Sequence, residues 1–221
     1  MPLLTIRDLE VRFPGLGRPA LFLPALTLEA GQALVVTGPS GSGKTTFLNR
    51  ITGLEASPAG AITWQGTDLG ALSEGARDRW RACTIGLVMQ EFHLFPGLSA
   101  LENVVLPQRL ARFRLPPAVV AEAEGLLARV GIERPDQRIE TLSRGQMQRV
   151  AVARALVGRP GVIVADEPTA SLDDEAGTAV ADLLVNLAKD AGASLIVASH
   201  DPVFFARIPR LLRLEAGRQR A

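Results

Sequence analysis

The stretch GPSGSGKT at residues 38–45 determines the fold that we expect for this chain. It matches the pattern G-x-x-x-x-G-K-[ST], follows a short apolar run at residues 33–37 and opens a segment with helical periodicity. Glycines let such a loop wrap around phosphate groups, so that successive backbone N–H groups face phosphate oxygens at a helix N-terminus. We therefore predict a strand, a phosphate-binding loop and a helix in succession, and a site for the triphosphate of a nucleotide.

Two side chains of this loop are expected to carry specific chemistry. Lys44 would place a compact positive charge on the β- and γ-phosphates, and the hydroxyl of Thr45 would ligate Mg²⁺. Only two of the 24 basic residues are lysines, so a lysine in this loop indicates a role that arginine does not fill. The expected ATP-binding residues of the loop are Gly38, Ser40, Gly41, Ser42, Gly43, Lys44, Thr45 and Thr46.

The composition limits the class of protein. The chain has 221 residues, 47% of them hydrophobic, and its 24 basic and 23 acidic residues give a net charge of +1. This balance argues against a disordered chain and against a strongly basic nucleic-acid-binding protein. No apolar run approaches the roughly 20 residues that cross a bilayer, and the charged residues Arg7 and Asp8 interrupt the apolar core that a signal peptide would need. We expect a cytoplasmic protein.

Apolar strands alternate with helices along the chain, which predicts an α/β fold with a parallel sheet. The strands are expected at residues 3–13, 20–28, 33–37, 61–64, 84–89, 162–165 and 194–198, the second of them broken by Pro24. The helices are expected at residues 43–53, 76–81, twice between 98 and 130, from 145 onward, and at 175–191. Residues 218–220 are expected to be a basic tail, and Cys83 a small buried hydrophobic residue.

Two acids follow the apolar run at residues 162–165. Alone, Asp166 and Glu167 would be acids of a solvated loop. Together with the phosphate-binding loop, they match a strand that delivers one acid to Mg²⁺ and a second to the attacking water. Asp166 would then hold the metal, and Glu167 would act as a general base.

Four further elements complete an ordered set. Gln90 comes after the phosphate-binding loop, LSRGQ lies at residues 142–146, PTASLD at 168–173, and His200 follows the last apolar run. In this order the chain resembles the ATP-binding subunits of ABC transporters over essentially its whole length. The segment FHLFPGLSALENV at residues 92–104 looks most like the group of lipoprotein-releasing, macrolide-exporting and cell-division ATPases.

The resemblance implies a P-loop ABC-ATPase fold: a RecA-like, mostly parallel sheet core, an N-terminal antiparallel β subdomain and an α-helical subdomain. The chain would form a single ABC ATPase domain over residues 1–221. Residues 1–90 and 160–221 would form the ATP-binding core with the β subdomain, and residues 91–159 the helical subdomain that carries the LSRGQ signature.

The resemblance also implies roles for single residues. Gln90 would contact Mg²⁺ or the attacking water and report the state of the nucleotide, and His200 would orient the γ-phosphate and the water. The signature residues Ser143, Gly145 and Gln146 would clamp the γ-phosphate of ATP bound to the opposite subunit. The dimer seam would contain Ser171 and Asp173. Phe13 would stack on adenine in place of the family's usual tyrosine, or would simply be a core phenylalanine.

Arg144 stands where the family usually has the second glycine of LSGGQ. A positive φ or close contact with phosphate at this position would impair the site, whereas an outward side chain would be tolerated. We expect the tolerated arrangement. The segment from Gln90 to Pro96 is expected to dock a helix of an integral membrane permease, although aromatic residues such as Phe92 and Phe95 could instead belong to the core.

The expected function is ATP hydrolysis, with ATP and Mg²⁺ as cofactors, in a head-to-tail homodimer that powers a separately encoded permease. The protein would be cytoplasmic, peripheral on the inner face of the cell membrane, and would bind no nucleic acid. An alternative is a regulatory ABC ATPase that transmits force across the membrane without transport, as in a cell-division complex. A nucleotide kinase would share the phosphate-binding loop but would lack LSRGQ and the histidine.

Overall fold

The computed structural model describes residues 3–112 and 114–220, and the chain divides into two compact units. Unit 1 consists of Met1–Arg81 and Ser194–Ala221, and unit 2 of Ala82–Ala193. The expected division into an ATP-binding core and a helical subdomain at residues 91–159 uses different boundaries and stays a prediction.

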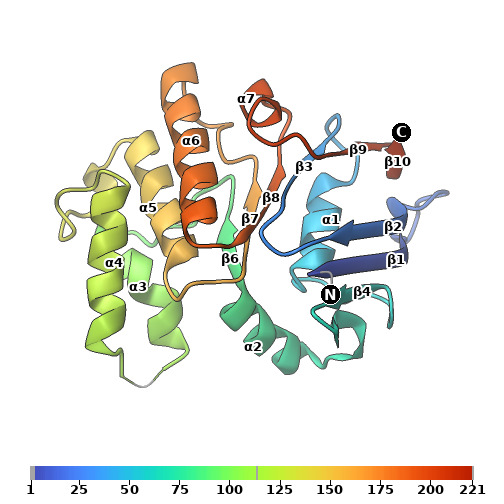
Figure 1. Ribbon diagram of the computed structural model, residues 1–221, viewed down its shortest axis with the longest axis horizontal. Helices are drawn as coiled ribbons and strands as arrows, with labels where there is room; N and C mark the ends of the chain where they lie inside the picture. Colours follow the sequence, from blue (N-terminus) through green and yellow to red (C-terminus); the bar gives the residue numbers. More distant parts are fainter. Residues whose placement is uncertain (1–2, 113, 221) are drawn as a thin grey trace. The chain divides into compact units, whose positions relative to one another are not determined.

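Unit 1 contains a mixed sheet (Figure 1). Its antiparallel part consists of β1 (Leu4–Val11), β2 (Leu21–Leu28), β4 (Ile62–Trp64) and β5 (Thr67–Asp68). Its parallel part pairs β3 (Ala33–Thr37) with both β8 (Ser194–Ala198) and β9 (Leu211–Glu215), and β10 (Arg218–Arg220) lies between β9 and β2. The strand order is β5-β4-β1-β2-β10-β9-β3-β8. The expected α/β fold with parallel strands is therefore confirmed, with an antiparallel part at the N-terminus.

The burial of the strands in unit 1 explains their sequences. β1 and β2 alternate buried and exposed residues along most of their length, as antiparallel strands with one solvated face do. β3 has three consecutive buried residues and β8 is buried throughout, as expected for parallel strands covered on both faces. Helix α1 (Lys44–Ile51), expected at residues 43–53, buries Phe47, Leu48 and Ile51. Unit 1 also contains the short helices η1 (Leu69–Ala71) and α7 (Pro202–Phe205) and most of α2 (Glu74–Thr84).

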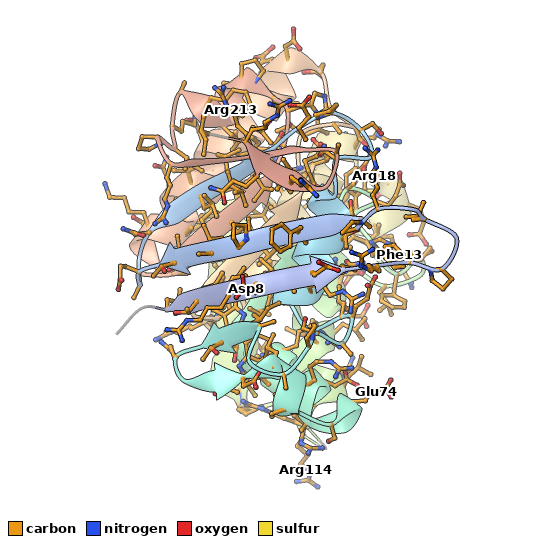
Figure 2. The ribbon with its side chains drawn as sticks, turned by 90° about the vertical axis from the view of Figure 1, so that its right-hand side faces the viewer. Asp8, Phe13, Arg18, Glu74, Arg114 and Arg213 are labelled. Atoms are coloured by element: carbon orange, nitrogen blue, oxygen red, sulfur yellow. The ribbon has the colours of Figure 1, made fainter. Side chains whose placement is uncertain are left out.

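The prediction that Pro24 breaks the second strand is wrong. β2 runs without interruption from Leu21 to Leu28, and the register pairs Arg7 with Ala25 and then Leu9 with Leu23. Proline has no N–H to donate to its neighbour strand. The irregularity falls instead on Asp8 of β1, which has φ 45° and is labelled in Figure 2. Aspartate is one of the few residues that enter this region at modest cost, so the pair of strands continues past the proline.

Three other expectations from the sequence need correction. Residues 218–220 form the strand β10 rather than a tail, because they pair antiparallel with β9. Cys83 is exposed rather than buried. It lies on α2 (Glu74–Thr84), which is longer than the helix expected at residues 76–81 and buries none of its residues.

Unit 2 combines two parallel strands with four long helices (Figure 1). The strands are β6 (Ile85–Val88) and β7 (Val162–Asp166), and the helices are α3 (Ala100–Leu110), α4 (Pro117–Arg129), α5 (Arg144–Leu156) and α6 (Asp174–Asp190), with the short helix η2 (Ile139–Thr141). α5 is central, since it contacts α3, α4, α6 and β6. The two helices expected between residues 98 and 130 are α3 and α4, and Pro117 is the first residue of α4.

Helix termini in unit 2 are set by side-chain caps. Ser99 and Glu102 form a capping box at the start of α3, and the carboxylate of Asp173 accepts the N–H of Ala176 at the start of α6. Within residues 3–112 and 114–220, none of the helices has both the length and the apolar character needed to span a bilayer.

Candidate functional site

The loop at residues 38–45 leaves the carboxyl end of β3 and enters α1, as predicted. Gly38 has φ 153°, and a Cβ at this position would lie 2.1 Å from the carbonyl oxygen of Leu214 and 2.7 Å from Oγ of Ser42. No side chain therefore fits there. Gly43 is the N-cap of α1 with φ 101°, and no side chain caps the helix. A glycine-rich loop that leads into a helix N-terminus is the arrangement that binds anions.

The polar groups of this loop fit a phosphate chain. Ser42 is buried, and its hydroxyl has no hydrogen-bond partner within the part of the chain that the structure describes. A buried hydroxyl without a partner is costly, so this atom is suited to a polar ligand. Nζ of Lys44 donates to the carbonyl oxygen of Gly38 at 2.8 Å and therefore lies over the loop. Of the other predicted loop residues, Ser40, Gly41 and Thr45 are exposed, and Thr46 is half-buried.

His200 lies at the same edge of the sheet as this loop. β3 and β8 are parallel neighbours with Val36 opposite Ala198, and the N–H of Ser199 donates to the carbonyl oxygen of Val36 at 3.0 Å. Because parallel strands end on the same side, the segments after Thr37 and after Ala198 leave the sheet together. His200 is exposed there. The topology thus brings together two elements that are far apart in the sequence.

Phe13 is exposed, with 39% of its surface accessible, so it is not a core residue. It lies in the loop that joins β1 to β2, where Figure 2 also labels Arg18. Leu16 in the same loop is 53% exposed. An exposed aromatic ring without a role in the core is available to stack on a planar ligand.

In unit 2, the predicted acids and Gln90 also share one edge. β6 and β7 are parallel with Val88 opposite Ala165, so Gln90 and Asp166 follow neighbouring strands at their carboxyl ends. Asp166 is the last residue of β7, and Glu167 has φ 44°. A positive φ is rare for glutamate, and the following Pro168 restricts the backbone further. Strained backbone of this kind persists only where surrounding contacts fix it, and it is concentrated at functional sites.

Gln148 supplies such a contact and was not predicted from the sequence. Its side chain is fully buried on α5, and Nε2 donates to the carbonyl oxygen of Pro168 at 2.7 Å. The N–H of Ala170 donates to the carbonyl oxygen of Glu167 at 3.2 Å and closes the turn. The signal for Gln148 in the sequence is weak: it is a polar residue in a helix, close to the apolar residues Val150, Ala151 and Val152. The structure shows these neighbours to be buried.

The signature residues form the N-terminus of α5, as predicted. Oγ of Ser143 accepts the N–H of Gln146 at 3.2 Å, and the side chain of Gln146 accepts the N–H of Ser143 at 2.9 Å. Arg144 is the first residue of the helix and is exposed, and its φ is not positive. The backbone strain that would impair the site is therefore absent, and tolerance of Arg144 beside phosphate stays a prediction. Gly145 is half-buried in the first turn.

The segment expected to dock a permease is partly exposed. Phe95 has 54% of its surface accessible, so it is not a core residue, whereas Phe92 is half-buried. Asn103, fully buried on α3, accepts the N–H of Phe95 at 2.7 Å and donates to its carbonyl oxygen at 3.2 Å. Asn103 was not predicted from the sequence, although a polar residue beside Val104 and Val105 on the apolar face of a helix is a detectable signal.

Two charged groups hold the rest of this segment. Arg154 on α5 donates to the carbonyl oxygen of Phe92 at 2.6 Å and also to that of His93. Burial lowers the pKa of the Arg154 guanidinium, but an arginine side chain remains charged in proteins. The carboxylate of Glu140 accepts the N–H of Gly97, and hydrogen bonds from its own N–H and from that of Gly97 lower the pKa of Glu140. These hydrogen bonds hold the backbone of residues 92–97 in place.

The predicted metal ligands have suitable chemistry. Thr45 in unit 1 and Gln90 and Asp166 in unit 2 present hydroxyl, amide and carboxylate oxygens, which are the donors that Mg²⁺ prefers. Within the described ranges, no cluster of three or more His, Cys, Asp or Glu side chains could hold a metal ion by itself.

A glycine-lined loop before α1, an acid pair after β7 and a serine-capped signature helix together define an ATPase of the ABC type. Residues 24–170 match the ABC transporter family, and the chain belongs to that family. It is an ATP-binding and ATP-hydrolysing subunit with the P-loop ABC fold.

Individual relatives indicate the group within the ABC transporter family to which the chain is similar. The chain is 42% identical over 201 residues to the lipoprotein-releasing system ATP-binding protein LolD of Anaeromyxobacter dehalogenans, covering 90% of this chain and 84% of that protein. It is 37% identical to the LolD of Pseudomonas fluorescens, and this match covers 97% of this chain and 96% of that protein. The chain also resembles the solved structure of the ATP-binding cassette MJ0796, a dimer in a post-hydrolysis state bound to ADP and Pi, with a TM-score of 0.87 and 30% sequence identity. The match covers 99% of this chain and 97% of that one. The group expected from residues 92–104 is thus confirmed.

Proposed function

We propose that two copies of this chain bind two ATP molecules between them, head to tail, and that closure on ATP and opening after hydrolysis drive an integral membrane permease encoded separately. The observation that carries this proposal is the buried, unpartnered hydroxyl of Ser42 within an uncapped glycine loop at the start of α1. The likeness to a dimeric cassette bound to ADP and Pi supports it.

Each copy would grip the triphosphate with its own loop. The backbone N–H groups at the start of α1 would face the phosphate oxygens, and Lys44 would swing from the carbonyl of Gly38 onto the β- and γ-phosphates. Phe13 would stack on adenine. The proposed ATP-binding set of the loop is Gly38, Ser40, Gly41, Ser42, Gly43, Lys44, Thr45 and Thr46.

Hydrolysis would be positional and electrostatic. Thr45, Gln90 and Asp166 would hold Mg²⁺, which when bound neutralises phosphate charge. The Glu167 carboxylate, fixed by its strained backbone, would accept the proton of the attacking water. The exposed His200 would orient that water and the γ-phosphate.

The second copy would complete each site. Ser143, Gly145 and Gln146 lie at the N-terminus of α5, where the helix dipole favours an anion, and they would contact the γ-phosphate of the opposite copy's ATP. The turn that contains Ser171 and Asp173 would line the dimer seam. The oxygen of the Ser143 hydroxyl accepts the N–H of Gln146, and its own O–H would donate to the phosphate.

The first test is the ATP-dependent dimer. Glu167→Gln removes the proton acceptor and keeps the shape, so ATP should bind without being hydrolysed and the mass should double in light scattering. Glu175→Gln, an exposed acid in the first turn of α6, is the matched control and should hydrolyse ATP normally. Adding Lys44→Ala to Glu167→Gln should abolish the dimer. A Glu167→Gln protein that binds ATP but stays monomeric would contradict the proposal.

We also propose that residues 90–96 dock the permease, which would place the protein in the cytoplasm, on the inner face of the cell membrane. Phe95 and Leu16 are almost equally exposed, at 54% and 53%. Phe95→Asp should therefore reduce co-purification with an ABC permease from solubilised membranes, whereas Leu16→Asp should not. Because LolD relatives are named for lipoprotein release, a lipoprotein-releasing permease is the first partner to test. Equal recovery with both variants would refute docking at this segment.

A further inference from the structure

The side chain of Arg144 contacts two segments that are far apart in the sequence. Its Nε donates to the carbonyl oxygen of Ser171 at 3.2 Å, and its guanidinium carbon Cζ lies 5.4 Å from the centroid of the Phe92 ring. Arg144 itself begins α5. All three residues belong to unit 2.

Phe92 is attached to α5 at both ends of the helix. Its carbonyl oxygen accepts a hydrogen bond from Arg154 in the last turn, while its ring packs under Arg144 in the first turn. The Arg144 guanidinium lies over the Phe92 ring, so a displacement of Phe92 changes this contact.

Ser171 lies in the turn between Glu167 and Asp173. The N–H of Leu172 donates to the carbonyl oxygen of Thr169 at 3.1 Å within this turn, and Asp173 then caps α6. The bond from Arg144 is the contact that joins this turn to the start of α5 at Ser171.

The planar guanidinium suits this double contact. Its face attracts the π-electrons of an aromatic ring while its N–H groups donate in the plane, so one side chain serves both neighbours. A glycine at this position, as in LSGGQ, would supply neither contact.

We infer that Arg144 is a positioning residue that couples the docking segment, through Phe92, to the turn before Asp173, through the carbonyl oxygen of Ser171. Through this side chain, a displacement of the turn at Ser171, on the nucleotide side of unit 2, shifts Phe92 and the surface that meets the permease. A displacement of that surface shifts the turn in the same way. This inference rests on the proposed function for the identity of the two ends, but the coupling itself is a property of the isolated chain.

Amide hydrogen exchange of the full chain tests the coupling. The reporters are the N–H groups of Leu172 and Phe95, each hydrogen-bonded within its own segment. Arg144→Gln removes the charge over the ring and should raise exchange about threefold to tenfold at both reporters, the size expected for one cation–π contact and one hydrogen bond. Arg149→Gln, on the same helix but bonded to the carbonyl oxygen of Val130, should leave both unchanged.

A double-mutant cycle separates coupling from local loosening. Phe92→Leu should accelerate exchange at Leu172, and should add nothing at Leu172 when Arg144→Gln is already present, whereas Phe92→Tyr should leave Leu172 unchanged. Phe92→Leu that affects Phe95 but not Leu172 would overturn the inference, as would equal effects of Phe92→Leu with and without Arg144.

A nucleotide experiment distinguishes failure of this inference from failure of the proposed function. In Glu167→Gln, ATP should change exchange at Phe95, and Arg144→Gln should reduce that change at least about threefold while the ATP-dependent dimer still forms. An undiminished change at Phe95 in a protein that dimerises overturns the inference alone. A protein that fails to dimerise with Arg144 intact contradicts the proposed function, and the exchange cycle without nucleotide still decides the coupling.

Discussion

The amide nitrogen Nε2 of Gln148 lies 2.7 Å from the carbonyl oxygen of Pro168, the residue next to Glu167. Gln148 is fully buried on α5, and Glu167 has φ 44° before a proline. A backbone in this conformation costs about 1–3 kcal/mol and has to be held by its surroundings. The signature helix therefore fixes the backbone that presents the proposed general base.

Gln148→Leu should lower kcat for ATP about tenfold and leave KM for ATP within about twofold, because the position of Glu167 matters in the transition state more than in binding. The free energy of unfolding should fall by only about 1 kcal/mol. The variant leaves the oxygen of Pro168 unpaired, but it also removes Oε1 of Gln148, which has no partner among the described residues. Steady-state kinetics and urea unfolding measure the two effects.

Arg149→Gln on the same helix is the matched control, since its guanidinium bonds to the carbonyl oxygen of Val130 and not to the turn after β7. It should leave kcat unchanged. If Gln148→Leu lost stability while retaining full kcat, Gln148 would be a structural residue with no effect on Glu167.

The proposed site residues are those whose chemistry is local in sequence. The loop at residues 38–45 and the acids after β7 can be recognised by the spacing of their residues and by the apolar strand that precedes each of them. Gln148 and Arg154 act through backbone atoms of segments 20 and 62 residues away in the sequence. Only the packing of α3 and α5 brings those segments within reach, so no motif in the sequence marks them.

Gly38→Ala should abolish tight ATP binding. The new Cβ would lie 2.1 Å from the carbonyl oxygen of Leu214, a backbone atom of β9 that cannot move aside as a side chain would. The loop must therefore shift, and we expect the dissociation constant for ATP to rise at least about tenfold, together with a lower Tm. Calorimetric titration with ATP and thermal unfolding check both.

Gly17→Ala is the matched substitution, because a Cβ there would meet nothing within 4 Å and φ is not positive. It should leave ATP affinity unchanged and should not lower Tm. Gly38→Ala with normal affinity would show that the close approach of this loop to β9 is not needed for binding.

The fold was predictable to the extent that each element carries its own periodicity. β3 and the buried face of α1 came out as expected, since apolar runs and helical spacing are read within one segment. The strand β2 was also expected, but the predicted break at Pro24 was wrong, because the proline is accommodated by a positive φ at Asp8 on the neighbouring strand. β10 was missed because Arg218 and Arg220 are exposed and only pairing with β9 makes the segment a strand.

Phe13→Ala should weaken ATP binding about fivefold to tenfold, the loss expected for one base-stacking contact. Phe13 is 39% exposed in the β1–β2 loop, so removing its ring should change Tm little. Because the ring is proposed to contact adenine alone, the affinity for inorganic tripolyphosphate should stay the same. Phe13→Tyr keeps the stacking surface and should bind ATP normally.

Leu16→Ala provides the control for this prediction, since Leu16 is in the same loop and is 53% exposed but has no aromatic face. Titrations of the three variants with ATP and with tripolyphosphate give six comparisons with the native chain that only a base contact satisfies together. If Phe13→Ala weakened ATP and tripolyphosphate equally, the ring would act on the phosphate-binding loop and not on the base. If it weakened neither, adenine would be held elsewhere.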